Sequence, residues 1–98
     1  MGQKMIRKTI STILVLTLAA CAGLGSDRVV VDRAGPDDLL KLRSGPGLGF
    51  GIIIGLPDGT ELNRYGCVTE VGQRWCEVSL VASPTVRGYV SADYLRPL

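Results

Sequence analysis

Apolar residues after position 28 fall in short runs that are rich in β-branched side chains. Glycine, proline, aspartate and serine separate the runs, a pattern that predicts short β-strands joined by turns. The expected strands cover residues 29–31, 39–43, 52–54, 61–65, 68, 75–78 and 86–90. Several short strands at such close spacing favour a small barrel or sandwich over a parallel sheet.

One turn and one irregularity are expected within this pattern. In Leu-Pro-Asp-Gly-Thr, Pro57 suits the first central position of a turn and Gly59 its tight end. Strict alternation of inward and outward side chains cannot continue through residues 61–68, because the residues that should point inward shift by one position near Gly66. We interpret this change as a β-bulge.

Six glycines lie between residues 44 and 60, and a phosphate-binding loop is one explanation for them. The stretch matches neither Gly-x-Gly-x-x-Gly nor the Gly-Lys-Ser/Thr end of a P-loop in any register. No amphipathic helical pattern follows whose amino terminus would hold an anion. We therefore attribute the glycines to the sharp bends, bulges and close backbone approaches of a small barrel.

Residues 1–20 have the three parts of a secretory signal. Lys4, Arg7 and Lys8 come first, an apolar stretch covers 9–20, and small residues precede Cys21. A transmembrane anchor is the alternative, but the apolar run is shorter than the roughly 20 residues that a bilayer core requires.

Leu-Ala-Ala-Cys, residues 18–21, resembles the lipobox of bacterial lipoproteins. The resemblance implies cleavage before Cys21 and attachment of lipid, palmitate included, to that cysteine. An ordinary secretory signal that happens to end beside a cysteine is the alternative. In that family a residue other than aspartate after the cysteine, here Ala22, implies an outer-membrane anchor facing the periplasm. We divide the chain into a signal peptide at 1–20, a tether at 21–28 and one domain at 29–98.

Charge and composition narrow the possible functions. The chain has no histidine, so it lacks the usual proton-transfer group near neutral pH and the commonest metal ligand. Removal of the signal leaves eight basic and nine acidic side chains, a net charge of −1. This balance removes the electrostatic argument for a nucleic-acid partner. No residue is marked as catalytic, cofactor-binding or metal-ligating, and we predict no enzyme activity.

Three stretches in this order resemble the bacterial SH3-like domain: LLKLRSGPGLGFGIIIGLPDGTEL, RWCEV and RGYVSADYL. Cys76 stands where an aromatic residue is common in that family, and Tyr89 where tryptophan is usual. The resemblance implies an all-β, partly open barrel of five or six short strands, with one 3₁₀ turn in Ser-Ala-Asp-Tyr-Leu. It also implies a module without catalytic activity, of the kind that binds peptidoglycan, its peptides or protein partners outside the cytoplasm.

Cys67 and Cys76 are the two cysteines outside the lipobox. If a hairpin turns on Val71 and Gly72, facing residues have numbers that sum to 143, so the two cysteines face each other about 4.5 Å apart at Cα. An exported protein meets oxidising conditions, so we predict a disulfide that contributes roughly 2–3 kcal/mol. A redox-active pair and a zinc site are the alternatives, but the spacing is not C-x-x-C and histidine is absent.

Aromatic residues are the candidate ligand contacts, because SH3-like barrels gather flat rings beside a long loop where an extended peptide binds. Of the five aromatics, we single out Trp75 and Tyr94, with packing of the rings in a small core as the alternative. The sequence thus predicts a lipid-anchored binding module of the cell envelope for peptidoglycan or a peptide. An accessory lipoprotein that docks on an envelope protein assembly is the second hypothesis, and a thiol-active enzyme is the third.

Overall fold

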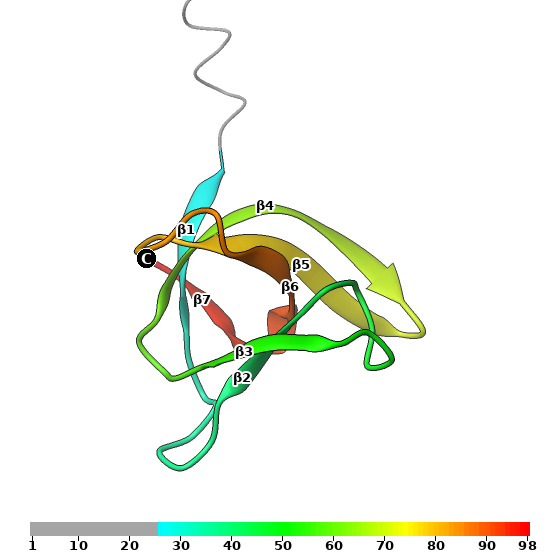
Figure 1. The fold of residues 1–98 in the computed structure, drawn as a ribbon, viewed down its shortest axis with the longest axis horizontal. Helices are drawn as coiled ribbons and strands as arrows, with labels where there is room; N and C mark the ends of the chain where they lie inside the picture. Colours follow the sequence, from blue (N-terminus) through cyan, green and yellow to red (C-terminus); the bar gives the residue numbers. More distant parts are fainter. Residues whose placement is uncertain (1–25) are drawn as a thin grey trace, which may run out of the picture.

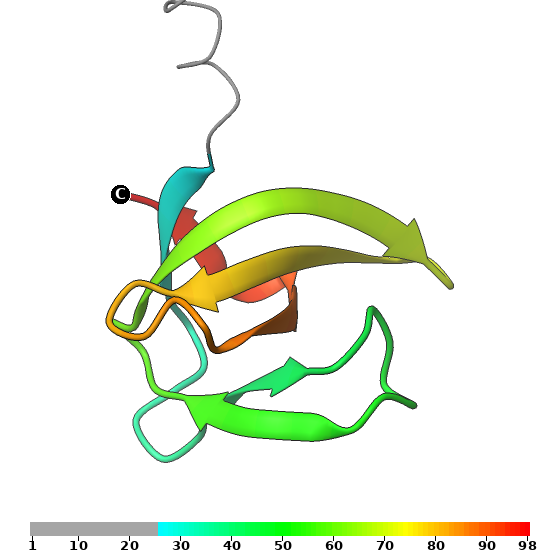
Figure 2. The same ribbon diagram turned by 45° about the horizontal axis from the view of Figure 1, so that its top comes forward.

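The computed structural model describes residues 26–98, which form one antiparallel sheet of seven strands in the order β3-β2-β6-β5-β4-β1-β7. The elements are β1 (Asp27–Val31), β2 (Leu40–Arg43), β3 (Ile52–Leu56), β4 (Glu61–Glu70), β5 (Gln73–Leu80), β6 (Arg87–Ser91), the 3₁₀ turn η2 (Ala92–Tyr94) and β7 (Leu95–Pro97). The sheet curls round on itself, but its two end strands, β3 and β7, do not pair (Figures 1 and 2). The predicted all-β, partly open barrel and its 3₁₀ turn are confirmed.

Strand number and bounds differ from the expectation at the first and last strands along the chain. There are seven strands rather than five or six, because the short β7 follows η2 and pairs with β1. β1 begins at Asp27, so the last two residues of the expected tether lie in the sheet, opposite Asn63 and Arg64 of β4. The start of β1 and the whole of β7 are strands because they pair with neighbouring strands. The alternation of apolar and polar side chains does not reveal such pairing. The expected signal peptide and Cys21 lie outside the described residues.

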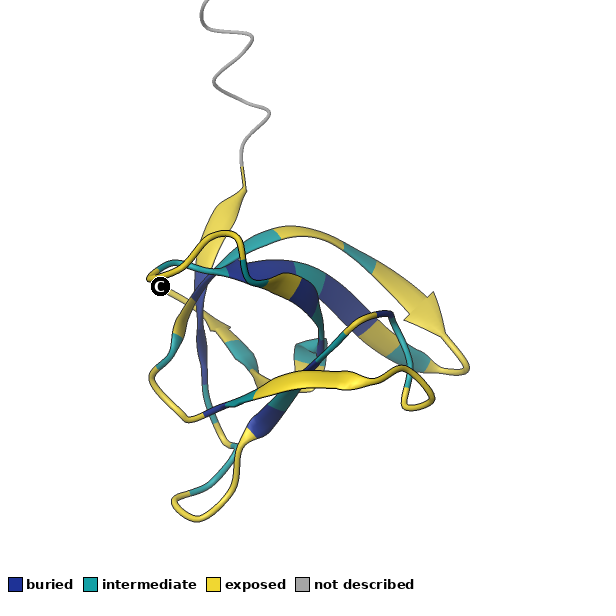
Figure 3. Ribbon diagram, viewed as in Figure 1, coloured by how far each residue is buried: buried dark blue, intermediate teal, exposed yellow. Residues whose placement is uncertain are grey.

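The core fills the inside of the curl. Buried and less buried positions alternate along β2 and β6, as the pleat requires (Figure 3). The fully buried side chains come from β1, β2, β4, β5 and β6: Val29, Val31, Leu42, Leu62, Cys76, Val78, Ser79 and Val90. Burial of each valine or leucine contributes about 1.5–3 kcal/mol, so this small cluster is the main source of stability.

The bulge expected near Gly66 is present in β4. Arg64 lies opposite Val78 and Gly66 lies opposite Glu77, which leaves Tyr65 as the extra residue. A bulge increases the local twist, and β4 curves strongly along its ten residues (Figure 2). This curvature lets one strand pair with β1 at its start and with β5 from Leu62 to its end.

The explanation of the glycines by backbone geometry is only partly correct. Positive φ angles occur at Gly35, Gly59 and Gly72, and no glycine between residues 44 and 52 has one. Gly45 is instead a close approach: a Cβ atom there would lie 2.4 Å from Cδ1 of Phe50, whose ring folds back over it. The loop therefore uses this glycine to let a ring pack on the backbone rather than to turn the chain.

Candidate ligand-binding groove

A groove with two lobes lies beside the loop of residues 44–51. Its first lobe is lined mainly by residues 33–43, and its second lobe reaches the tip of the β4–β5 hairpin. The lobes have volumes of about 300 and 460 Å³. Both are lined by Leu48 from the loop, Trp75 from β5, and Ser91 and Tyr94 from the end of β6 and η2. The groove thus brings together segments that are far apart in the sequence.

The structure places Trp75 and Tyr94, the predicted contact residues, in the wall of the same groove. Trp75 is only 5% exposed and Tyr94 is 37% exposed. Most of the indole therefore packs against the protein, and the tyrosine offers the larger free surface. Trp75 is therefore mainly a packing residue whose remaining surface lines the groove.

The other three aromatic residues line neither lobe. Phe50 covers Gly45, and Tyr89 lies in β6 opposite Arg43 and Glu77. Tyr65, at the bulge, shares a hydrogen bond of 2.7 Å between its hydroxyl and the hydroxyl of Ser79. The guanidinium of Arg87 lies 3.8 Å from the centre of the Tyr65 ring. These rings stabilise the sheet and the loop.

Two exposed apolar side chains flank the second lobe, and the sequence analysis missed both. Leu48 is 77% exposed, and Val71 at the hairpin tip is fully exposed. Val71 has a φ of 49° and Gly72 a φ of 76°, which is a type I′ turn. Asparagine and aspartate favour the first of these positions, and a β-branched residue there is strained. The unusual valine at this turn position was the sequence signal that could have identified Val71.

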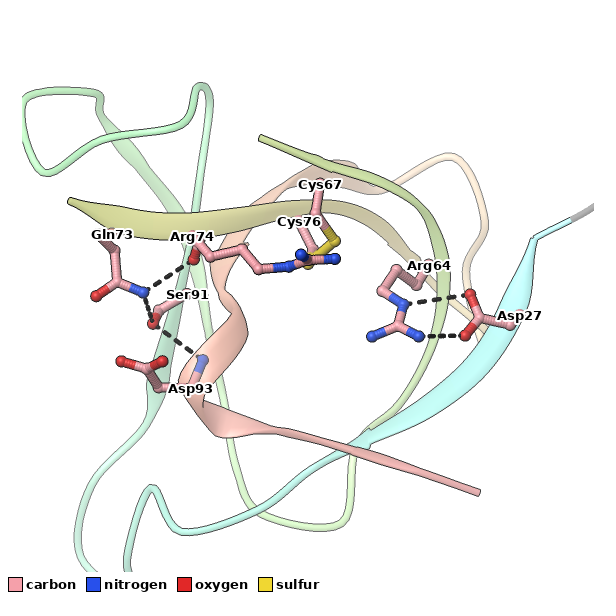
Figure 4. Close-up of a disulfide and its surroundings, with 8 residues drawn as sticks. All are labelled: Asp27, Arg64, Cys67, Gln73, Arg74, Cys76, Ser91 and Asp93. Atoms are coloured by element: carbon pink, nitrogen blue, oxygen red, sulfur yellow. Dashed lines mark hydrogen bonds and ion pairs between the residues drawn. A yellow bond between two sulfur atoms is a disulfide. The ribbon is translucent and has the colours of Figure 1, made fainter. Parts of the chain in front are cut away.

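Hydrogen bonds fix η2 against the start of β5. Gln73 Nε2 donates to Ser91 Oγ at 3.0 Å and to the backbone carbonyl of Arg74 at 2.9 Å (Figure 4). Ser91 Oγ also accepts from the backbone N–H of Asp93 at 3.3 Å, which caps the 3₁₀ turn. These hydrogen bonds therefore link η2 to β5 at the base of the groove.

Charged side chains line the first lobe of the groove. In the first lobe, Lys41 Nζ lies 3.2 Å from a carboxylate oxygen of Asp38. The pKa of Asp38 lies below its usual value, because its carboxylate accepts from the backbone N–H of Leu39 and from Lys41. Arg43 Nη1 donates to the backbone carbonyls of Leu48 at 3.2 Å and Phe50 at 3.1 Å, and so supports the loop.

Cys67 and Cys76 form a disulfide in the β4–β5 hairpin (Figure 4). The predicted register is confirmed, since Cys67 faces Cys76, Val68 faces Trp75 and Glu70 faces Gln73. The two Cα atoms are 3.9 Å apart, closer than the expected distance of about 4.5 Å. The covalent link lies one residue pair from Trp75 and so braces the strand that carries it.

Two further observations concern only the part of the chain that the structure describes. Residues 26–98 contain no group of three or more His, Cys, Asp or Glu side chains placed to hold a metal ion. In the same range, no helix has the length and apolar character needed to cross a membrane.

The family model described as the bacterial SH3 domain matches residues 38–96. The match includes every residue shared by the two lobes. No curated protein and no solved structure gives a match to the chain. Domains of the matched family are typically binding modules rather than catalysts, and peptidoglycan is a common ligand.

Proposed function

The chain belongs to the bacterial SH3 domain family, and on this premise we propose that it is a non-catalytic binding module of the cell envelope. Its ligand is peptidoglycan or a peptide, held in the groove around Trp75 and Tyr94. The observation that carries the proposal is the groove itself, which joins these two rings to the exposed side chains of Leu48 and Val71.

The shape and lining of the groove support an extended ligand. Lobes of about 300 and 460 Å³ fall in the size range of small-ligand sites. Aromatic and aliphatic side chains supply contact area at a low cost in conformational entropy, and the hydrogen-bonded base is organised in advance. A ligand that runs through both lobes gains from all four apolar side chains at once.

A lipid anchor on Cys21 is the second part of the proposal, supported by the lipobox sequence and the signal before it. Because β1 begins at Asp27, only residues 22–26 separate the lipid from the sheet. Five extended residues span at most about 17 Å, so the domain stays close to the membrane surface. We place it on the periplasmic side of the outer membrane. Labelling of cells with palmitate tests the anchor, and Cys21→Ser should abolish incorporation.

Binding is tested by co-sedimentation of residues 22–98, which contain the whole sheet, with purified sacculi. The wild-type domain should sediment, and Tyr94→Ala and Leu48→Ser should each reduce the bound fraction severalfold. Ile52→Ser is the matched control, because Ile52 is an exposed aliphatic residue of β3 that lines neither lobe. Unchanged binding by both groove variants, with loss in the control, would show that another surface binds the wall.

One observation favours the second candidate, an accessory lipoprotein docked on an envelope protein. β3 lies at an end of the sheet and carries three exposed isoleucines in a row, Ile52, Ile53 and Ile54. Residues 44–57 contain no charge, although natural edge strands usually carry charges that prevent pairing. Such an edge accepts a strand from a protein partner. Absence of any retention by sacculi, together with cross-links from position 53 to one envelope protein, would favour this function.

A further inference from the structure

The two lobes of the groove carry opposite charges. Three basic side chains, Arg33, Lys41 and Arg43, line the first lobe together with one acidic side chain, Asp38. Two acidic side chains, Glu70 and Asp93, line the second lobe, which has no basic lining residue. A ligand that occupies both lobes therefore passes from a positive to a negative environment.

Neighbouring side chains leave most of these charges uncompensated. Lys41 forms an ion pair with Asp38. Arg33 donates to the backbone carbonyl of Asp93, and Arg43 donates to two backbone carbonyls of the loop, so neither guanidinium meets a carboxylate within 4 Å in residues 26–98. In the same range, Glu70 and Asp93 take part in no ion pair. Two positive and two negative charges thus remain for a ligand.

We infer that the groove binds a short extended peptide in one direction, with a carboxylate in the first lobe and an ammonium group in the second. This inference rests on the proposed function and adds the chemistry and orientation of the ligand. The middle of the peptide lies against Leu48, Trp75 and Tyr94, which line both lobes. A ligand with one sign of charge would gain from the charges of one lobe only, and a neutral glycan from those of neither.

The size of the effect follows from the exposure of these charges. Contacts between exposed charges change affinity by about twofold to fivefold each, and salt screens them. Removal of either the carboxylate or the amines from the peptide should therefore weaken binding by about twofold to fivefold. The preference should shrink when the ionic strength is raised from about 0.15 M to 1 M, where the Debye length falls to roughly 3 Å.

The test uses three forms of the peptide Lys-Ala-Gly-Ala and residues 22–98 of the chain. One form has free ends, the second is amidated at its carboxyl end, and the third lacks both amines, with acetyl-alanine in place of lysine. Dissociation constants from NMR titration should be lowest for the free form. Arg33→Gln with Arg43→Gln should remove the preference for the free carboxylate alone, and Glu70→Gln with Asp93→Asn should remove the preference for the amines alone.

Control variants distinguish the effect of charges in the lobes from the effect of the net charge of the domain. Arg74→Gln and Glu61→Gln are the controls, because both residues are exposed and line neither lobe. Because Arg43 also supports the loop, Lys41→Gln is a second variant of the first lobe and should weaken the same preference. A paramagnetic label on the α-amine of the peptide lysine, which leaves the side-chain ammonium group free, should broaden the amide signal of Glu70 more than those of residues 38–43.

The outcomes distinguish this inference from the proposed function. Equal binding of all three peptide forms, or stronger broadening of residues 38–43 than of Glu70 by the label on the lysine end, would overturn the inference while retention by sacculi leaves the proposed function intact. Failure of every peptide and of sacculi to bind would overturn both.

Discussion

Two hairpins form the walls of the groove, and they are built in different ways. β4 and β5 have ten and eight residues, and a disulfide links them next to Trp75. β2 and β3 have four and five residues and are joined by the loop of residues 44–51. Each hairpin presents one exposed apolar side chain to the second lobe, Val71 or Leu48.

The bonds that hold each wall differ accordingly. A covalent link and a long ladder of strand pairs fix the β4–β5 wall. The loop depends on the ring of Phe50 over Gly45 and on the two hydrogen bonds that Arg43 donates. β2 meets β6 in a single register pair, Arg43 with Tyr89. We conclude that one wall is rigid by construction and the other is set by a few local contacts, so a ligand should move the loop first.

Removal of the disulfide should have the largest effect. Cys67→Ala together with Cys76→Ala should lower the free energy of unfolding by about 2.5 kcal/mol, because the unfolded chain regains the entropy of a short closed loop. Urea denaturation of the variant and of the wild type measures the difference. A loss below about 1 kcal/mol would mean that strand pairing alone fixes this wall.

Gly45→Ala should have the next largest effect and should act on the opposite wall. A Cβ atom at this position overlaps the ring of Phe50, so the ring must leave, at a cost of about 1–2 kcal/mol in unfolding free energy. Gly49→Ala is the matched control, because no atom lies within 4 Å of its Cβ position and its φ is not positive. Equal denaturation midpoints for the two variants would show that the ring does not hold the loop.

Val71→Asn should stabilise the domain, unlike the two changes above. Asparagine relieves the strain of a β-branched residue at positive φ, so the free energy of unfolding should rise by about 1 kcal/mol. Binding to sacculi should fall at the same time, because the exposed apolar side chain at the groove is lost. Val68→Asn, in the strand portion of the same hairpin, should lower the stability instead. A stabilised Val71→Asn variant that binds as well as wild type would exclude a contact role for Val71.

The smallest expected effect is a dependence of stability on pH that arises where β1 meets β4. The guanidinium of Arg64 donates to the carboxylate of Asp27 and holds the pKa of that group below its usual value. The folded pKa is thus lower than the unfolded value of about 3.9, so the contribution is complete above that pH and is lost as the pH falls through the folded pKa.

Exposure limits this contribution to about 0.5 kcal/mol or less. Thermal melts between pH 5 and pH 2 should show a slightly steeper loss of stability for the wild type than for Asp27→Asn. Identical slopes for the two proteins would show that the ion pair contributes nothing to holding β1 on β4.

The sequence predicted the features that local patterns encode. The register of Cys67 with Cys76 follows from the position of one turn, and the bulge at Tyr65 follows from a break in the period of two. The three-residue β7, Leu-Arg-Pro, has no apolar alternation and exists because β1 offers it a partner. It was therefore missed.

Of the residues that line the groove, the sequence predicted only the two aromatic ones. Trp75 and Tyr94 were chosen because aromatics are few and SH3-like domains bind ligands with them. The contribution of Leu48, the strain at Val71 and the opposite charges of the lobes depend on how the loop, the hairpin tip and η2 come together in space. No local pattern records those distances between segments.

The position of β1 within the sheet has a mechanical consequence. β1 lies between β4 and β7, and the chain enters it at Asp27 (Figure 1). On the proposed function, with a lipid on Cys21 and a ligand in the wall, tension between the two layers would enter the domain along this strand. Two ladders of hydrogen bonds share that load in shear, and a strand attached along one side only would peel away more easily.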